Sequence, residues 1–228
     1  GGPDGPYYQS ERTALYQAAL DKLEQMGLVY PCFCTRAELH AASAPHREDG
    51  QVIYAGTCRN LTAEQAAERA RQRAPALRLR VPDEAWVFTD GHMGPYRENL
   101  ARDCGDMVVR RADGVYVYQL AVTVDDGEAG VNQVVRGADL LSSAPRQMYL
   151  QELFGFPHPI YAHVPMLLAP DGRRLSKRDR DLDLGSLRKT TTPEAILGTL
   201  AYACGLLDRR GPASAKELAS IFTWNQIK

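Results

Sequence analysis

The sequence lacks several features that would place it in familiar protein classes. It contains no run of 18 apolar residues, which excludes a membrane-spanning helix of ordinary length. Its net charge of −1 excludes nucleic-acid binding through overall charge, so any RNA contact must rest on local basic patches. The five cysteines are too unevenly spaced for a secreted disulfide scaffold, and no Ser/His/Asp triad pattern is present. We therefore expect a cytoplasmic protein with reduced thiols and no membrane partner.

The pattern of strands and helices predicts an α/β fold. Apolar, strand-like segments at 115–122, 131–136 and 160–168 alternate with helices that begin near residues 143 and 192. Such alternation is typical of a parallel sheet covered by helices. With 228 residues, 44% of them hydrophobic, the chain can bury one sizeable core and a smaller module.

The first helix is predicted over 10–26, with Ser10 as its cap and Gly27 as its stop. Two pairs with capping-box spacing predict the starts of further helices. Alternation over 77–81 predicts a half-buried strand, and the turn residues 111–114 predict a hairpin. The expected apolar face of the first helix comprises Leu15, Ala19, Leu23 and Met26. The capping-box pairs are Thr62 with Gln65 and Ser214 with Glu217.

Three cysteines have a spacing that suits a metal ion. Cys32 and Cys34 are separated by one residue, and Cys58 follows after a gap. Zinc requires four ligands in a tetrahedron, so one further donor is needed. From the residues alone, free buried thiols are an alternative, and the fourth ligand stays open among His40, His46 and Tyr54.

A basic loop over 171–179 carries four cations within six residues. Lys177 in this loop is suited to offset the charge that develops on a triphosphate during phosphoryl or adenylyl transfer. The alternative is an ordinary solvated surface loop.

Arg136 lies at the end of the predicted strand 131–136, where open α/β sheets bind ligands. A guanidinium binds a carboxylate through a fork of donors, so Arg136 suits an acidic substrate. Its alternative is an ion pair with Asp139 or Asp126. Tyr118, on the predicted strand 115–122, is on its own a plain core aromatic.

In their order and spacing, the segments 116–122, 125–126, 134–140 and 175–178 resemble the second half of a class I glutamyl-type aminoacyl-tRNA synthetase. The cysteine pattern, Cys-x-Cys followed by Tyr-x-x-x-Cys, is similar to the zinc site of the glutamyl-queuosine tRNA(Asp) synthetases. These are shortened paralogues of glutamyl-tRNA synthetases. The Cys-x-His closing pair of zinc-bearing glutamyl-tRNA synthetases is not found here, because Arg59 and Asn60 follow Cys58.

The resemblance implies ATP-dependent activation of L-glutamate and its transfer to queuosine at the wobble position of tRNA(Asp), with Mg²⁺ on the ATP, by a monomer. Two alternatives are a truncated glutamyl-tRNA synthetase that charges tRNA(Glu) and a non-catalytic RNA-binding remnant. The implied ligands of a structural zinc are Cys32, Cys34, Tyr54 and Cys58. The implied glutamate contacts are Tyr118 and Arg136, and the implied catalytic, ATP-binding residue is Lys177.

The resemblance also implies a domain organisation. We expect a helical remnant of the first catalytic half over 1–30 and an inserted zinc-bearing module over 31–114. The second half of the Rossmann-type catalytic domain follows over 115–190, and a helical C-terminal segment over 191–228. The family's opening strand and helix, with a His-Ile-Gly-His-type signature, are not found in this sequence, which does not begin with Met. We therefore expect a fragment whose Rossmann-type sheet lacks its first strands.

Overall fold

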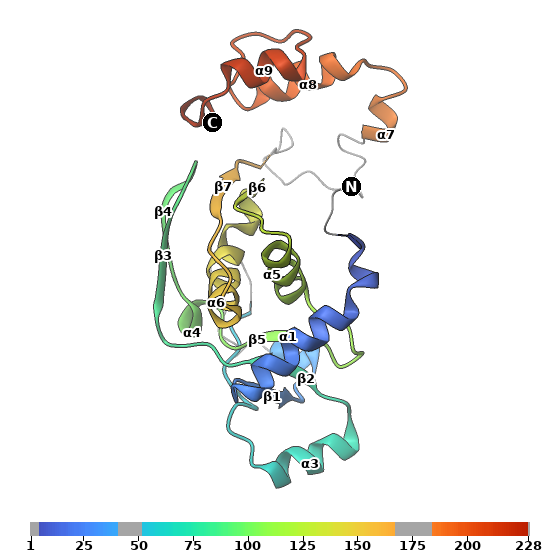
Figure 1. Ribbon diagram of the computed structural model, residues 1–228, viewed down its shortest axis with the longest axis vertical. Helices are drawn as coiled ribbons and strands as arrows, with labels where there is room; N and C mark the ends of the chain where they lie inside the picture. Colours follow the sequence, from blue (N-terminus) through green and yellow to red (C-terminus); the bar gives the residue numbers. More distant parts are fainter. Residues whose placement is uncertain (1–4, 41–51, 167–183, 228) are drawn as a thin grey trace. The chain divides into compact units, whose positions relative to one another are not determined.

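The structure is a computed structural model, and it describes residues 5–40, 52–166 and 184–227 (Figure 1). The chain divides into two compact units, each built from separate stretches of sequence. Unit 1 comprises 1–88, 95–133 and 142–159, and unit 2 comprises 89–94, 134–141 and 160–228. Within the described residues, no helix is both long enough and apolar enough to span a bilayer.

Unit 1 contains a three-stranded antiparallel sheet with the order β1-β2-β5. Figure 1 shows α5 and α6 side by side in this unit, and α5 also contacts α1. The core between sheet and helices includes Leu20, Leu79, Leu120 and Leu150, all fully buried. The elements are α1 (Thr13–Gln25), β1 (Val29–Cys32), α2 (Arg36–Leu39), α3 (Ala63–Gln72), β2 (Ala76–Leu79), α4 (Leu100–Asp103), β5 (Met107–Arg110), α5 (Tyr118–Glu128) and α6 (Ala144–Phe154).

Unit 2 contains the paired strands β6 (Gln133–Gly137) and β7 (Ile160–Val164), apart from Gln133 itself. It also holds 89–94, the tip of a hairpin formed by β3 (Ala85–Asp90) and β4 (Gly94–Asn99). The hairpin is missing from the sequence-based expectations. Among the described residues, the other elements of unit 2 are the first part, 138–141, of the 3-10 helix η2 (Ala138–Ser143), with α7 (Leu184–Leu187), α8 (Pro193–Ala203), α9 (Ala215–Ile221) and η4 (Trp224–Gln226).

Several helix-end signals are confirmed. Thr62 and Ser214 both form complete capping boxes, at the starts of α3 and α9. The first helix starts later than expected, because Gln9–Glu11 form the short 3-10 helix η1 and Arg12, not Ser10, precedes α1. Gly27 follows α1 with a φ of 70°, a conformation that glycine adopts without strain.

The predicted apolar face of α1 is wrong in part. Leu15 and Met26 are 40% and 43% exposed, whereas Tyr16 and Leu20 are buried together with Leu23. The buried stripe is therefore displaced around the helix. Tyr16 is part of that stripe because its ring joins the core while its hydroxyl donates to Asp125 at 2.8 Å.

The predicted strand over 115–122 is also wrong. The chain is extended only as far as Val117, where Arg110 and Tyr116 form a single antiparallel bridge, and α5 begins at Tyr118. The many β-branched residues favour a strand, but Leu120 and Val124 lie four residues apart on the buried face of a helix. Packing in the unit 1 core therefore overrides local propensity.

Candidate functional site

Three cysteine sulfurs gather at the end of β1. The Sγ atoms of Cys32, Cys34 and Cys58 all lie within 4.8 Å of one another, and those of Cys34 and Cys58 are 3.7 Å apart. A tetrahedral zinc ion with Zn–S bonds of 2.3 Å separates two sulfur ligands by about 3.8 Å. The cluster therefore fits a tetrahedral metal, with no histidine in this group within the described part of the chain.

Tyr54 lies beside this cluster with its hydroxyl directed at it. The hydroxyl oxygen is 3.5 Å from Cys32 Sγ and accepts a hydrogen bond of 2.8 Å from the backbone N–H of Cys58. A tetrahedral zinc with a sulfur ligand and an oxygen ligand at about 2.0 Å separates these two atoms by about 3.5 Å. Of the other candidates for the fourth ligand, His40 lies outside the cluster, and His46 lies outside the described residues.

The surroundings of Cys32 and Cys34 shift the pKa values of these two thiols in opposite directions. Burial alone would raise its pKa, but hydrogen bonds from Tyr54 and the Cys34 backbone, with Arg78 nearby, bring the pKa of Cys32 below its ordinary value. Burial and the charge of Cys32 raise the pKa of Cys34 to about 12. Burial and the contact with Cys32 also raise the pKa of the Tyr54 phenol. A bound cation would therefore displace the protons of Cys34 and Tyr54.

The segment that carries Tyr54 is held against the unit 1 sheet by a close backbone contact. Tyr54 N donates to Cys104 O at 3.2 Å, and Tyr54 forms a parallel bridge with Gly105. A Cβ atom on Gly105, whose φ is 71°, would lie 2.2 Å from Tyr54 O. The guanidinium of Arg78 stacks 3.6 Å above the Tyr54 ring. Sequence reasoning missed the parts played by Gly105 and Arg78, since a single glycine or arginine carries no local signal.

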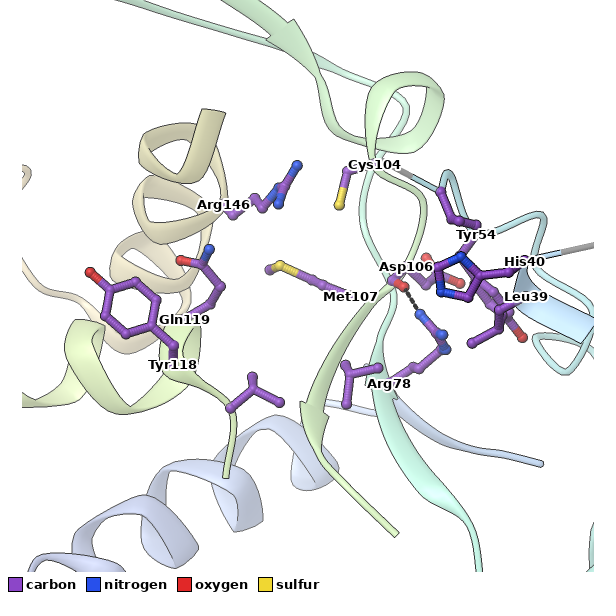
Figure 2. A pocket seen from close by; sticks show the side chains of 13 residues that line it. Leu39, His40, Tyr54, Arg78, Cys104, Asp106, Met107, Tyr118, Gln119 and Arg146 are labelled. Carbon is purple, nitrogen blue, oxygen red and sulfur yellow. Dashed lines mark hydrogen bonds between the residues drawn. The ribbon is translucent and has the colours of Figure 1, made fainter. Parts of the chain in front are cut away.

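A cavity of about 350 Å³ adjoins this segment in unit 1. Figure 2 shows Tyr118, Gln119 and Arg146 on one side and Tyr54, His40 and Arg78 on the other. Gln119 is fixed by bonds of 2.9 Å to Ser143 Oγ and from Gln147 Nε2, and Arg146 lies 3.6 Å from the carboxylate of Glu98. Tyr118, which the sequence predicts as a glutamate contact, is the first residue of α5, and its side chain lines this cavity.

Arg136 lies on β6, near the strand end, as predicted. Its Nε donates to His163 Nε2 at 3.0 Å, and its Nη2 donates to Leu140 O at 3.3 Å. Its guanidinium carbon lies 5.3 Å from the centre of the Tyr161 ring. On the far side of His163, Nδ1 contacts Asp90 Oδ2 at 2.6 Å. Sequence reasoning missed Asp90 and His163, which are far apart in the chain and match no motif.

The remaining predicted site residues are placed as follows. Lys177 and the rest of the basic loop lie outside the described residues. Tyr118 belongs to unit 1 and Arg136 to unit 2. Their roles as glutamate contacts stay predictions.

A family model described as the catalytic domain of class I tRNA synthetases (E and Q) matches residues 2–218. A Glutamyl-Q tRNA(Asp) synthetase from Symbiobacterium thermophilum is 49% identical, with 100% of this chain and 71% of that protein covered. A protein of the same name from Nitratidesulfovibrio vulgaris is 47% identical, with 98% of this chain and 70% of the relative covered.

Among solved structures, the glutamate-tRNA synthetase of Elizabethkingia anophelis is similar over the whole of this chain, with a TM-score of 0.77 and 26% identity. A glutamate tRNA ligase from Elizabethkingia meningosepticum, crystallised with its amino acid, gives a TM-score of 0.76 and 26% identity. The chain spans 52% and 51% of the lengths of these two proteins.

Proposed function

The chain belongs to the class I tRNA synthetases of the E and Q group and, within it, to the Glutamyl-Q tRNA(Asp) synthetase family, and from this premise we propose its reaction. The protein activates L-glutamate with ATP and transfers the glutamyl group to queuosine in tRNA(Asp). The observation that carries the proposal is the 49% identity to a protein of that name over the whole chain.

The metal cluster is the part of this proposal with the most geometric support. A zinc ion would be held by Cys32, Cys34, Tyr54 and Cys58, since the sulfur–sulfur and sulfur–oxygen distances of 3.7 Å and 3.5 Å suit a tetrahedron. All four positions of the tetrahedron are then filled by protein, which is typical of a structural site. Through these four residues, a bound zinc ion would link the end of β1 to the segment that carries Tyr54 and Cys58.

The activation step needs positioning and charge neutralisation more than acid–base chemistry. The glutamate α-carboxylate attacks the α-phosphate of ATP in line, and pyrophosphate leaves. In the proposal, Arg136 binds the side-chain carboxylate, and Tyr118 contacts the amino acid. Lys177 and Mg²⁺ offset the charge on the phosphates. Support for Arg136 comes from its charge and from its place near the end of β6.

Glutamate-dependent exchange of pyrophosphate into ATP tests this proposal. The assay uses the complete gene product that contains this sequence, with and without tRNA. Exchange without tRNA is the expected result. Exchange only with tRNA(Glu) would instead favour a glutamyl-tRNA synthetase, the activity for which the two similar Elizabethkingia proteins are named. Binding of tRNA with no exchange under either condition would favour a non-catalytic RNA-binding module.

A further inference from the structure

Unit 2 contains a buried chain of hydrogen bonds that ends on Arg136. Asp90 Oδ2 lies 2.6 Å from His163 Nδ1, and His163 Nε2 lies 3.0 Å from Arg136 Nε. His163 is 0% exposed and Asp90 is 2% exposed. The three residues come from the tip of the β3–β4 hairpin, from β7 and from β6, and we call them the Arg136 hydrogen-bond chain. Gly91 N also donates to Tyr161 O at 2.8 Å, which holds the hairpin tip against β7.

The two contacts of His163 determine its tautomer. Arg136 Nε always carries a hydrogen, so His163 Nε2 must accept, and the proton of the imidazole must lie on Nδ1. Asp90 accepts that proton in a hydrogen bond as a carboxylate. Although burial opposes it, the contacts from His163 and from backbone N–H groups keep the pKa of Asp90 below its ordinary value. A neutral His163 with Nδ1–H is the form that satisfies both neighbours.

The same contacts orient Arg136. His163 accepts from Nε, the inner nitrogen, and the guanidinium carbon lies over the Tyr161 ring, 5.3 Å from its centre. Together with the hydrogen bond from Nη2 to Leu140 O at 3.3 Å, they constrain the rotation of the guanidinium, and with it the direction of its Nη1 and Nη2 fork. A planar fork binds a carboxylate well only when its direction matches that of the ligand. We propose that Asp90 and His163 are positioning residues that hold Arg136 in the orientation that binds the glutamate side-chain carboxylate. This inference rests on the proposed role of Arg136.

Asp90 also has a structural role that any experiment must preserve. Its Oδ1 accepts hydrogen bonds from the backbone N–H groups of His92, Met93 and His163, at 3.0, 2.9 and 3.0 Å. Truncation to alanine would remove the acceptor of all three donors, including the buried N–H of His163, and would test folding more than positioning. An amide keeps them satisfied, because an asparagine at this position must place its oxygen toward the three donors.

Asp90→Asn is therefore the diagnostic change. With its oxygen facing the backbone donors, the new NH₂ group faces His163 Nδ1 and converts it to an acceptor. The proton moves to Nε2, where it meets the Arg136 Nε–H, and two donors 3.0 Å apart repel. A tautomer change of this kind preserves geometry and removes function in serine proteases. We expect KM for glutamate to rise about tenfold or more, with KM for ATP within about twofold.

Two substitutions of His163 separate positioning from folding. The amide oxygen of a glutamine is as many bonds from Cβ as the Nε2 of a histidine. In His163→Gln this oxygen can therefore occupy the place of Nε2 and still accept a hydrogen bond from Arg136. The amide of His163→Asn reaches only the place of Nδ1 and keeps the contact with Asp90. Both variants place an amide at this buried position. If His163 had a purely structural role, the two variants would therefore change the KM values for glutamate and for ATP to a similar extent. We expect His163→Gln to retain more glutamate affinity than His163→Asn.

The experiment combines kinetics with spectroscopy on the complete gene product. Pyrophosphate exchange gives KM for glutamate and for ATP in each variant, and Asp83→Asn serves as an exposed control. Nitrogen-15 NMR of the imidazole reports the tautomer of His163 and the coupling between its Nε2 and Arg136 Nε. We expect the Nδ1–H tautomer in the wild-type protein and the Nε2–H tautomer in Asp90→Asn. We also expect that, in Asp90→Asn, only the KM for glutamate rises.

A wild-type Nε2–H tautomer, or an unchanged glutamate KM after the tautomer reverses, would overturn the inference. If the wild-type protein shows no glutamate-dependent exchange, the proposed function fails instead. In that case the positioning role toward glutamate falls with it, while the NMR measurement still shows whether His163 orients Arg136.

Discussion

The hydroxyl of Tyr54 offers the sharpest test of the metal site. Tyr54→Phe removes one oxygen and keeps the ring, so the stacking of Arg78 on that ring is retained. Two contacts are lost: the one with Cys32 Sγ at 3.5 Å and the one from Cys58 N at 2.8 Å. The Cys58 N–H is then left buried without its acceptor, which costs about 1–3 kcal/mol of folding stability.

The larger effect is on the metal itself. If Tyr54 supplies the fourth ligand, its loss leaves three thiolates and a position open to water. We expect zinc affinity to fall about 100-fold, equivalent to about 2.7 kcal/mol. Cys58→Ser is expected to weaken zinc binding by at least as much, since it replaces a thiolate ligand with a hydroxyl.

Competition with a chelator measures the zinc affinity of the wild-type protein and of both variants. Ultraviolet difference spectroscopy during zinc addition detects ionisation of a tyrosine, because the phenol must lose its proton to bind the metal. The wild-type protein is expected to give this signal and Tyr54→Phe to lack it. Equal zinc affinities for the two, with no tyrosinate signal in the wild-type protein, would refute Tyr54 as a ligand.

Three further predictions concern backbone, pH and substrate. Gly105→Ala should lower the free energy of unfolding by more than about 2 kcal/mol, because its Cβ would collide with Tyr54 O. Thermal unfolding measures this change. The control is Gly27→Ala, which has a similar φ but open space around its Cβ and should cost only about 1–2 kcal/mol. Because the folded-state pKa of Asp90 is depressed, its contribution to stability is present above its unfolded pKa of about 3.9 and is lost as pH falls through the lower folded value. Below about pH 4, the free energy of unfolding of Asp90→Asn should therefore depend less on pH than that of the wild-type protein. Equal slopes of this free energy against pH in the two proteins would contradict the prediction. Arg136→Gln should raise KM for glutamate by more than about tenfold in pyrophosphate exchange, and an unchanged KM would remove Arg136 from the substrate site.

Structural features that depend on only a few neighbouring residues can be predicted from the sequence. The capping boxes at Thr62 and Ser214 are confirmed because each is complete within four residues. The spacing of the three cysteines and the chemistry of thiolates predict a metal cluster, and the structure brings their sulfurs together. The resemblance to class I synthetases is confirmed by the match over 2–218.

Features that depend on contacts between residues far apart in the sequence cannot be predicted in this way. The segment 115–124 contains several β-branched residues that favour a strand, but from Tyr118 it is a helix whose Leu120, Ala121 and Val124 pack in the unit 1 core. His163 looks like any strand residue, and 73 positions separate it from Asp90, which contacts its ring. Gly105 resembles any turn glycine until the backbone of Tyr54 lies against it.

Transfer of labelled glutamate to tRNA tests the central claim most directly. The complete gene product is incubated with ATP, labelled glutamate and either tRNA(Asp) carrying queuosine, the same tRNA without queuosine, or tRNA(Glu). The account predicts label on tRNA(Asp) only when queuosine is present, and on that base. Label on tRNA(Glu), or on tRNA(Asp) that lacks queuosine, would contradict it.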